Sequence, residues 1–217
     1  MRARFHADLE GVIATLVRMA DGVTTAMRHA TTALLSADAA LAAQVLADDN
    51  QIDVLYHQVE DQVSQLMARQ APVAGDLRLT ITALNAASDL ERMGDLAVHV
   101  AKIVARRAPQ VAAVPEIRDI ISGMADCAAQ IGAKVSTVLR TADADAAAEL
   151  AVDDDAVDAL HERLFAVLLD PAWPHGVGPA IDAAQLGRWY ERYADHAVNA
   201  GRRVIYFVTG QPHPARN

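Results

Sequence analysis

A pair of carboxylates recurs in this chain with the same spacing and the same neighbours. Glu91 and Asp95 stand in the segment ERMGDLAVH. One hundred residues later, Glu191 and Asp195 stand in the segment ERYADHAVN. Residues four apart lie on one face of an α-helix, so each pair would present two carboxylates together. Because hard cations prefer such oxygen ligands, each segment is a candidate metal-binding surface.

Neighbouring residues can complete these ligand sets. His99 lies four residues beyond Asp95 and offers a ring nitrogen, and Asn199 holds the equivalent place and offers an amide oxygen. Other acidic or histidine side chains that can contribute lie upstream in each half of the chain, at Asp49, Asp53, Glu60, Asp154, Asp158, His161 and Glu162. We expect a divalent or trivalent ion, with Mg, Mn, Zn and Fe all left open.

Two other interpretations of the acidic segments remain open. One is a metal-free structural adaptor, in which Glu91 and Glu191 pair with nearby arginines on a solvated helix face. The other is a metal-dependent enzyme. The sequence has no glycine-rich phosphate loop, no HExxH, no CxxC and no Glu-x-x-His. The absence of these motifs argues against nucleotide hydrolysis and against a ferritin-like di-iron oxidase, and favours a binding protein over an enzyme.

Composition favours an all-α protein. The 217 residues are 53% hydrophobic but only 4% aromatic, and alanine, the strongest helix former, dominates. The net charge of −9 repels nucleic acid and anionic lipid, so no nucleic-acid partner is expected. Arg106-Arg107 and Arg202-Arg203 are interpreted as cationic helix ends. Cys127 is the only cysteine, so no intrachain disulfide can form, and we expect it to be a small core residue.

Proline, glycine and capping residues divide the chain into long helices. No apolar run is long enough to span a membrane, and no secretory signal is expected. The predicted helices cover residues 5–35, 38–70, 76–107, 115–141, 143–169 and 181–208. The segment DNQIDVL, which begins at Asp49, resembles DDAVDAL, which begins at Asp154, at an offset of 105 residues. Two repeats in the same order predict two three-helix bundles, at 1–108 and 109–217.

Helical geometry also predicts where the carboxylates lie. In the last predicted helix, Tyr193 belongs to an apolar stripe that lies opposite Glu191 and Asp195. Each carboxylate pair is therefore expected on an outer or groove surface, away from the core. Trp173, in the proline-rich break, is expected to anchor that loop to the bundle.

The chain resembles the PhoU family, accessory regulators of bacterial phosphate-specific transport. The resemblance rests on PVAGDLRL followed by DLERMGD in the first half, and on YERYADHAVN in the second half. It implies two three-helix bundles related by a pseudo-two-fold axis, with metal clusters at the matching positions, Glu91, Asp95, Glu191 and Asp195.

The resemblance also implies a function and partners. The protein would be a cytoplasmic, non-enzymatic homodimer that acts as a negative regulator of phosphate uptake and phosphate-starvation signalling. Its partners would be the phosphate ABC transporter, through the ATPase subunit, and a sensor histidine kinase. Membrane association would occur only through these partners.

Three residues depart from the family pattern. Tyr56 stands where a first acidic residue is usual in the second helix, so that ligand set would be incomplete or take another ion. His99 is not the usual residue beside the first motif, and Ala194 replaces the glycine found at Gly94. With Asn199 on the other side, these differences predict unequal metal occupancy in the two halves.

Overall fold

The fold is described by a computed structural model of residues 2–70 and 72–211. Within these residues the chain forms six α-helices and no β-strand, which confirms the predicted all-α class. The helices are α1 (Arg2–Ser36), α2 (Ala39–Gln70), α3 (Gly75–Arg107), α4 (Pro115–Thr141), α5 (Ala144–Leu168) and α6 (Val177–Thr209). None of them is long and apolar enough to cross a membrane, as far as the described residues go.

The two tight helix–helix connections have the same local structure. Ala37 and Ala142 both adopt left-handed backbone conformations, with φ of 55° and 53°. Asp38 and Asp143 then accept hydrogen bonds from backbone N–H groups in the first turns of α2 and α5. These bonds satisfy donors that a helix start leaves without partners, as the sequence predicted. The two connections lie 105 residues apart, so the left-handed residue and the capping aspartate are repeated in both halves of the chain.

The largest difference from the predicted boundaries is the start of α6. The sequence predicts a start at residue 181, but the helix begins at Val177. Gly176, with φ of 74°, makes the turn that precedes the helix. Pro179 falls in the first turn, where backbone N–H groups have no acceptor within the helix. The lack of an N–H in proline therefore removes no helical hydrogen bond at this place. The proline is therefore compatible with an earlier start.

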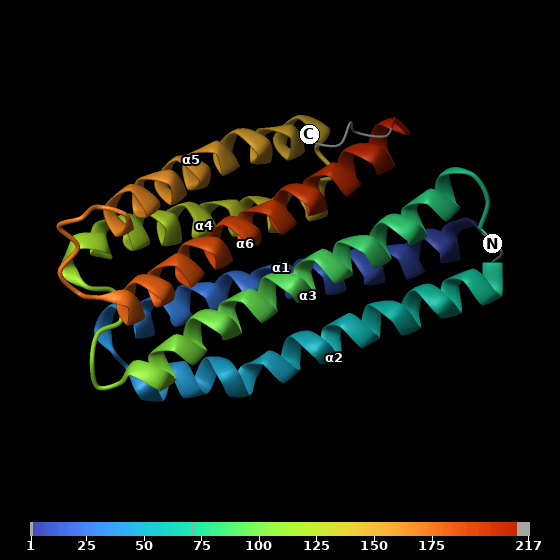
Figure 1. The fold of residues 1–217 in the computed structure, drawn as a ribbon. Helices are drawn as coiled ribbons and strands as arrows, with labels where there is room; N and C mark the ends of the chain where they lie inside the picture. The colour runs from blue at the N-terminus through green and yellow to red at the C-terminus, as the bar shows by residue number, and fades with distance from the viewer. Residues whose placement is uncertain (1, 71, 212–217) are drawn as a thin grey trace.

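The helices form two layers (Figure 1). The helices α2, α3, α6 and α5 lie side by side in this order in one layer, and α1 and α4 lie behind them. The two halves meet where α1 packs against α4 and α3 packs against α6. The buried side chains of both halves form one continuous hydrophobic cluster. Across it, the hydroxyls of Thr31 on α1 and Tyr190 on α6 share a hydrogen bond of 2.6 Å. The two repeats therefore share one core.

Candidate functional site

The first carboxylate pair lies along the line where α3 packs against α2, and the acidic region between these two helices is called the acidic groove. Glu91 and Asp95 are half-buried on α3, with side-chain exposures of 24% and 36%. Asp49 on α2 lies opposite: a Cβ added at Gly94 would be 3.7 Å from Asp49 Oδ1. This distance is ordinary van der Waals contact, so residue 94 on α3 lies directly beside the Asp49 carboxylate on α2.

Four carboxylates act on one another in this groove. Burial raises the pKa of Glu91 above its ordinary value, and the negative charges of Asp95, Asp53 and Asp49 raise it further. Burial, Asp53 and Asp95, in this order, likewise raise the pKa of Asp49. The structure thus brings together Asp49 and Asp53 from α2 with Glu91 and Asp95 from α3.

Arg92 supplies part of the counter-charge from the edge of the groove. Its Nη1 donates to Asp95 Oδ2 at 2.8 Å, and its Nε lies 3.5 Å from Glu91 Oε2. The Arg92 side chain is 60% exposed, and ion pairs of such exposed groups contribute about 1 kcal/mol or less. Excess negative charge therefore remains between the helices.

The chemistry of these donors suits a hard cation. Four carboxylates whose mutual repulsion disfavours the charged state would be stabilised by a divalent ion between them. As placed, no group of three or more His, Cys, Asp or Glu side chains is arranged to hold an ion, within the described part of the chain. The metal assignment at Glu91 and Asp95 therefore stays a prediction, supported by charge and donor type.

The remaining ligand candidates of the first half lie beside the groove. The Nδ1 of His99 donates to the backbone oxygen of Asp95 at 2.6 Å, which leaves Nε2 for other contacts. Its ring packs 5.2 Å from that of Trp189 on α6. Glu60 Oε2 lies 2.9 Å from His57 Nδ1. Burial raises the pKa of Tyr56, and the Glu60 and Glu91 carboxylates raise it further.

The second half is arranged differently. Arg188 donates to both carboxylate oxygens of Glu191, whose side chain is only 16% exposed, whereas Asp195 is exposed. The equivalent residue in the first half is Ser88, which has no charge. The sequence indicates this pairing, because Arg188 lies three residues before Glu191 and side chains three residues apart are neighbours on a helix. The two carboxylate pairs are therefore not electrostatically equivalent.

The other candidates of the second half vary in burial. Asp154 is buried, with a relative exposure of 1%, and Asp158 is half-buried. Asn199 Oδ1 accepts a hydrogen bond of 3.2 Å from Arg202 Nη1. His161 is half-buried, and its ring makes an edge contact with Phe165 at 5.0 Å. Neither carboxylate pair lies in the core, as predicted, although Arg188 covers Glu191.

Neutralising Asp49 is expected to stabilise the protein at pH 7. Because its pKa is raised on folding, the folded state binds this proton more tightly than the unfolded chain. Stability therefore falls as pH rises from about 4, the ordinary aspartate value, through the raised folded value. Asp49→Asn removes that loss and should add a few tenths of a kcal/mol at pH 7, by analogy with like-charge helix pairs. Urea unfolding at pH 7 and pH 4 measures this difference.

The gain should be smaller at pH 4, because the raised pKa keeps more of the folded wild-type carboxyl protonated there than at pH 7. Asp119→Asn, at an exposed α4 position, is the matched control and should change stability little at either pH. An Asp49→Asn variant that is less stable than wild type at pH 7 would contradict the repulsion described here.

The first basic pair lies where the sequence predicted and has a partner that it did not predict. Arg106 and Arg107 stand in the last turn of α3, and both donate to the buried carboxylate of Asp182 at the start of α6. Asp182 escaped the sequence analysis because no repeat or motif marks it. Cys127 is half-buried, and burial raises its thiol pKa, which disfavours the reactive thiolate. Trp173 packs against the core cluster, as expected for a residue that anchors its loop to the bundle, and its Nε1 donates to the Gly176 oxygen within the loop at 2.9 Å.

Comparison with known proteins agrees with the duplicated fold. A family profile, described as the PhoU domain, matches the chain twice, over residues 16–104 and 121–204. The Mycobacterium tuberculosis protein named phosphate-specific transport system accessory protein PhoU homolog 2 is 44% identical over 210 residues, covering 97% of this chain and 99% of that protein. PhoU homolog 1 of the same species is also 44% identical, with 97% and 95% covered.

Solved structures show the same architecture. The crystal structure of PhoU from Pseudomonas aeruginosa matches with a TM-score of 0.82 at 30% identity, covering 95% of this chain and all of that one. The phosphate transport system regulatory protein PhoU from Streptococcus pneumoniae matches with a TM-score of 0.87 over 97% of this chain. At 23% identity, that second match supports the fold alone. The duplicated profile and the full-length relatives together establish that this chain belongs to the PhoU family of phosphate transport accessory proteins.

Proposed function

We propose that this protein is a cytoplasmic, non-enzymatic negative regulator of phosphate uptake and phosphate-starvation signalling. Its partners would be the ATPase of a phosphate ABC transporter and a sensor histidine kinase, and it would act as a homodimer. The observation that carries the proposal is similarity along nearly the whole chain to proteins named as phosphate transport accessory proteins. The sequence has no glycine-rich phosphate loop, HExxH, CxxC or Glu-x-x-His motif, which is consistent with a binding role.

Deletion of the gene in its host, followed by complementation, tests the regulatory role. With ample phosphate, the deletion strain should express phosphate-starvation genes and accumulate phosphate, and wild-type protein should restore repression. Affinity purification of the tagged protein under the same conditions should recover the transporter ATPase or the kinase. Unchanged expression and uptake, together with recovery of neither partner, would refute the proposal.

We also propose that the groove between α2 and α3 binds a divalent cation through Asp49, Asp53, Glu91 and Asp95. The support is the partial burial of these carboxylates and their closeness to one another, which raise the pKa values of Asp49 and Glu91. The groove between α5 and α6 would bind more weakly, because Arg188 already supplies a positive charge to Glu191. The ions tested should include Mg²⁺ and Mn²⁺, which prefer oxygen ligands.

Metal-free protein should therefore gain thermal stability when Mn²⁺ is added. At a free concentration of ten times the dissociation constant, mass action predicts a gain of about 1.4 kcal/mol. The double variant Glu91→Gln/Asp95→Asn should lose this gain. Glu191→Gln/Asp195→Asn is the matched control, with the same chemical changes, and should retain most of it. Calorimetry with and without a chelator measures the effect, and equal losses in both variants would contradict the unequal grooves.

A further inference from the structure

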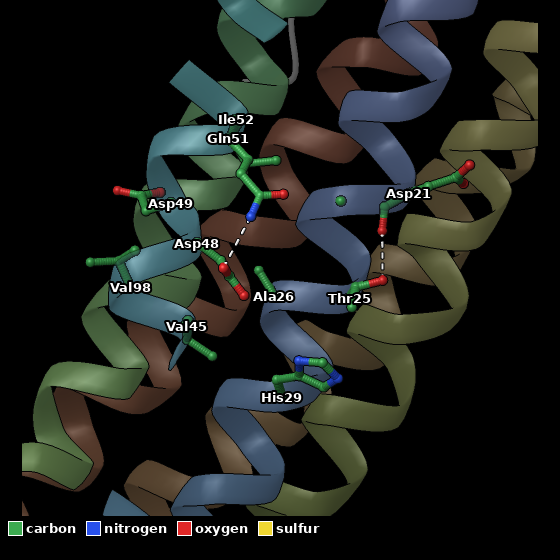
Figure 2. Close-up of a pocket in the computed structure, with 11 residues that line it drawn as sticks. Asp21, Thr25, Ala26, His29, Val45, Asp48, Asp49, Gln51, Ile52 and Val98 are labelled. Carbon is green, nitrogen blue, oxygen red and sulfur yellow. Dashed lines mark hydrogen bonds between the residues drawn. The ribbon is translucent and has the colours of Figure 1, made fainter. Parts of the chain in front are cut away.

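A second groove lies between α1 and α2, and it extends to Val98 on α3 and to Asp49, which also belongs to the acidic groove. Its volume is about 290 Å³. Figure 2 shows Asp48 and Gln51 on the side of α2 that faces α1, with Ala26 and His29 opposite on α1. Gln51 Nε2 donates to Asp48 Oδ1 at 3.0 Å. The aliphatic part of the lining comes from Gly22, Ala26, Val45, Ile52 and Val98. The groove thus combines an apolar floor with a carboxylate at its edge.

The equivalent place in the second half is occupied by larger side chains. The α1–α2 pair aligns with the α4–α5 pair at an offset of 105 residues. This offset relates the last residues of α1 and α4, Ser36 and Thr141, and also the left-handed residues that follow them, Ala37 and Ala142. At this offset, Cys127 and Ile131 stand where the first half has Gly22 and Ala26. Both contribute to the hydrophobic cluster around α4 and α5. The smaller Ala26 leaves more space beside α2 than Ile131 would, whereas the Ile52 side chain packs directly against Gly22.

A cation of the chain itself lies at this place in the second half. Lys134 is the equivalent of His29, and Asp153 is the equivalent of Asp48. Lys134 Nζ lies 2.6 Å from Asp153 Oδ2, and it donates to Glu149 Oε2 at 3.0 Å. In the first half, Asp48 has no ion pair with any side chain of the described residues. One copy of the unit therefore holds an ammonium group against this carboxylate, and the other copy has an open groove.

We infer that the α1–α2 groove is a docking site for a lysine side chain of a partner protein. The ammonium group would pair with Asp48, as Lys134 pairs with Asp153 in the second half. The lysine methylenes would cover the aliphatic floor, which suits the apolar stem of this side chain. Asp21 and Asp49 also line the groove and add negative potential, and no lysine or arginine is among the lining residues. The docking site borders the proposed metal site at Asp49, but Asp48, which would pair with the ammonium, is not one of the proposed metal ligands. The inference does not depend on the proposed function.

An NMR titration of the full-length ¹⁵N-labelled protein tests this assignment. The probe is the peptide acetyl-Ala-Lys-Ala-Lys-Ala-amide, and the control peptide has norleucine in place of both lysines. The lysine peptide should shift the amide signals of the groove residues on α1 and α2, and the norleucine peptide should not. Asp48→Asn should weaken binding by up to about fivefold, because it removes the charge that pairs with the ammonium.

Two further variants copy the second half into the first. His29→Lys supplies an internal ammonium beside Asp48, and Ala26→Ile fills the floor, so each should weaken peptide binding at least as strongly as Asp48→Asn. Asp119→Asn, an exposed α4 position with the same charge change, should leave binding unchanged. Urea unfolding of each variant separates loss of binding from loss of folding.

Several outcomes would overturn the inference. These are equal binding of the norleucine peptide, equal weakening by Asp119→Asn, full binding by folded His29→Lys, or no shift at the groove amides. Sedimentation of wild type and Asp48→Asn adds one more. If the wild type self-associates and Asp48→Asn abolishes that association, the occupant is a second copy of this chain, and the partner-protein assignment is wrong.

Discussion

Replacing Gly132 by alanine is expected to destabilise the protein by about 2 to 3 kcal/mol, the upper part of the usual range for overpacking. Gly132 on α4 lies at the junction with α1 and α6. A Cβ at this position would be 2.4 Å from Thr24 Oγ1 and 2.9 Å from the Tyr193 hydroxyl oxygen. Thr24 is held in place by its hydrogen bond of 2.7 Å to the Ala20 oxygen, and Tyr193 is fully buried. Neither neighbour can move aside without losing contacts.

Urea or thermal unfolding measures this effect, with a melting temperature lower by roughly 4 to 12 °C for a chain of this size. Gly11→Ala is the matched control, because a Cβ there would meet only Gln62 Nε2, at 3.9 Å. It should stabilise by up to about 1 kcal/mol through helix propensity. Adding Thr24→Ala to Gly132→Ala should restore much of the lost stability. Equal effects of the two glycine substitutions would show that the α1–α4–α6 junction is looser than described.

Replacing Asp182 by alanine is expected to destabilise the protein by about 2 kcal/mol. Asp182 is 3% exposed and accepts hydrogen bonds from Arg106 and Arg107. These bonds join the end of α3 to the start of α6, and thus join the two halves. Charge-assisted hydrogen bonds contribute about 1.5 to 3 kcal/mol each, but the arginine side chains are 57% and 31% exposed and regain water when the aspartate is removed.

Denaturant unfolding of Asp182→Ala and Asp182→Asn separates charge from shape. The asparagine variant keeps the size of the side chain but should still lose most of the stabilisation, because it cannot pair with two guanidinium groups. Asp119→Ala, at an exposed position, should change stability by about 0.5 kcal/mol or less. If Asp182→Ala behaves like Asp119→Ala, the contact does not hold the halves together.

The helices could be predicted closely because their boundaries depend on local features. Asp38 and Asp143 cap helices through their nearest neighbours, and proline and glycine interrupt the helical pattern wherever they occur. The start of α6 was the exception. Pro179 is both a helix breaker and a good first-turn residue, and the sequence alone does not separate these roles.

Part of the candidate site could also be predicted. The repeated Glu-Arg-x-x-Asp segments identified Glu91, Asp95, Glu191 and Asp195 and their position outside the core. Two further contacts also have a sequence signal. Arg188 lies three residues before Glu191, which indicates their pairing on one helix. Lys134 and Asp153 align with His29 and Asp48 at one offset, which indicates that a lysine replaces a histidine in the second half. The contact of Arg106 and Arg107 with Asp182 could not be found this way. Arg106 and Arg107 lie 76 and 75 residues before Asp182, and their contact with it depends on how α3 packs against α6.

The sequence by itself determined that this protein is a duplicated helical unit that carries the same carboxylate pair twice. Helix formation, capping and the spacing of side chains on one helix depend on residues a few positions apart, so they can be predicted from sequence. Only the tertiary structure decided that Asp49 and Asp53 crowd Glu91 and Asp95 and that α1 and α2 leave an open groove. Those features depend on contacts between helices, such as the close approach of Ile52 on α2 to Gly22 on α1, and such contacts arise only when helices distant in sequence pack together.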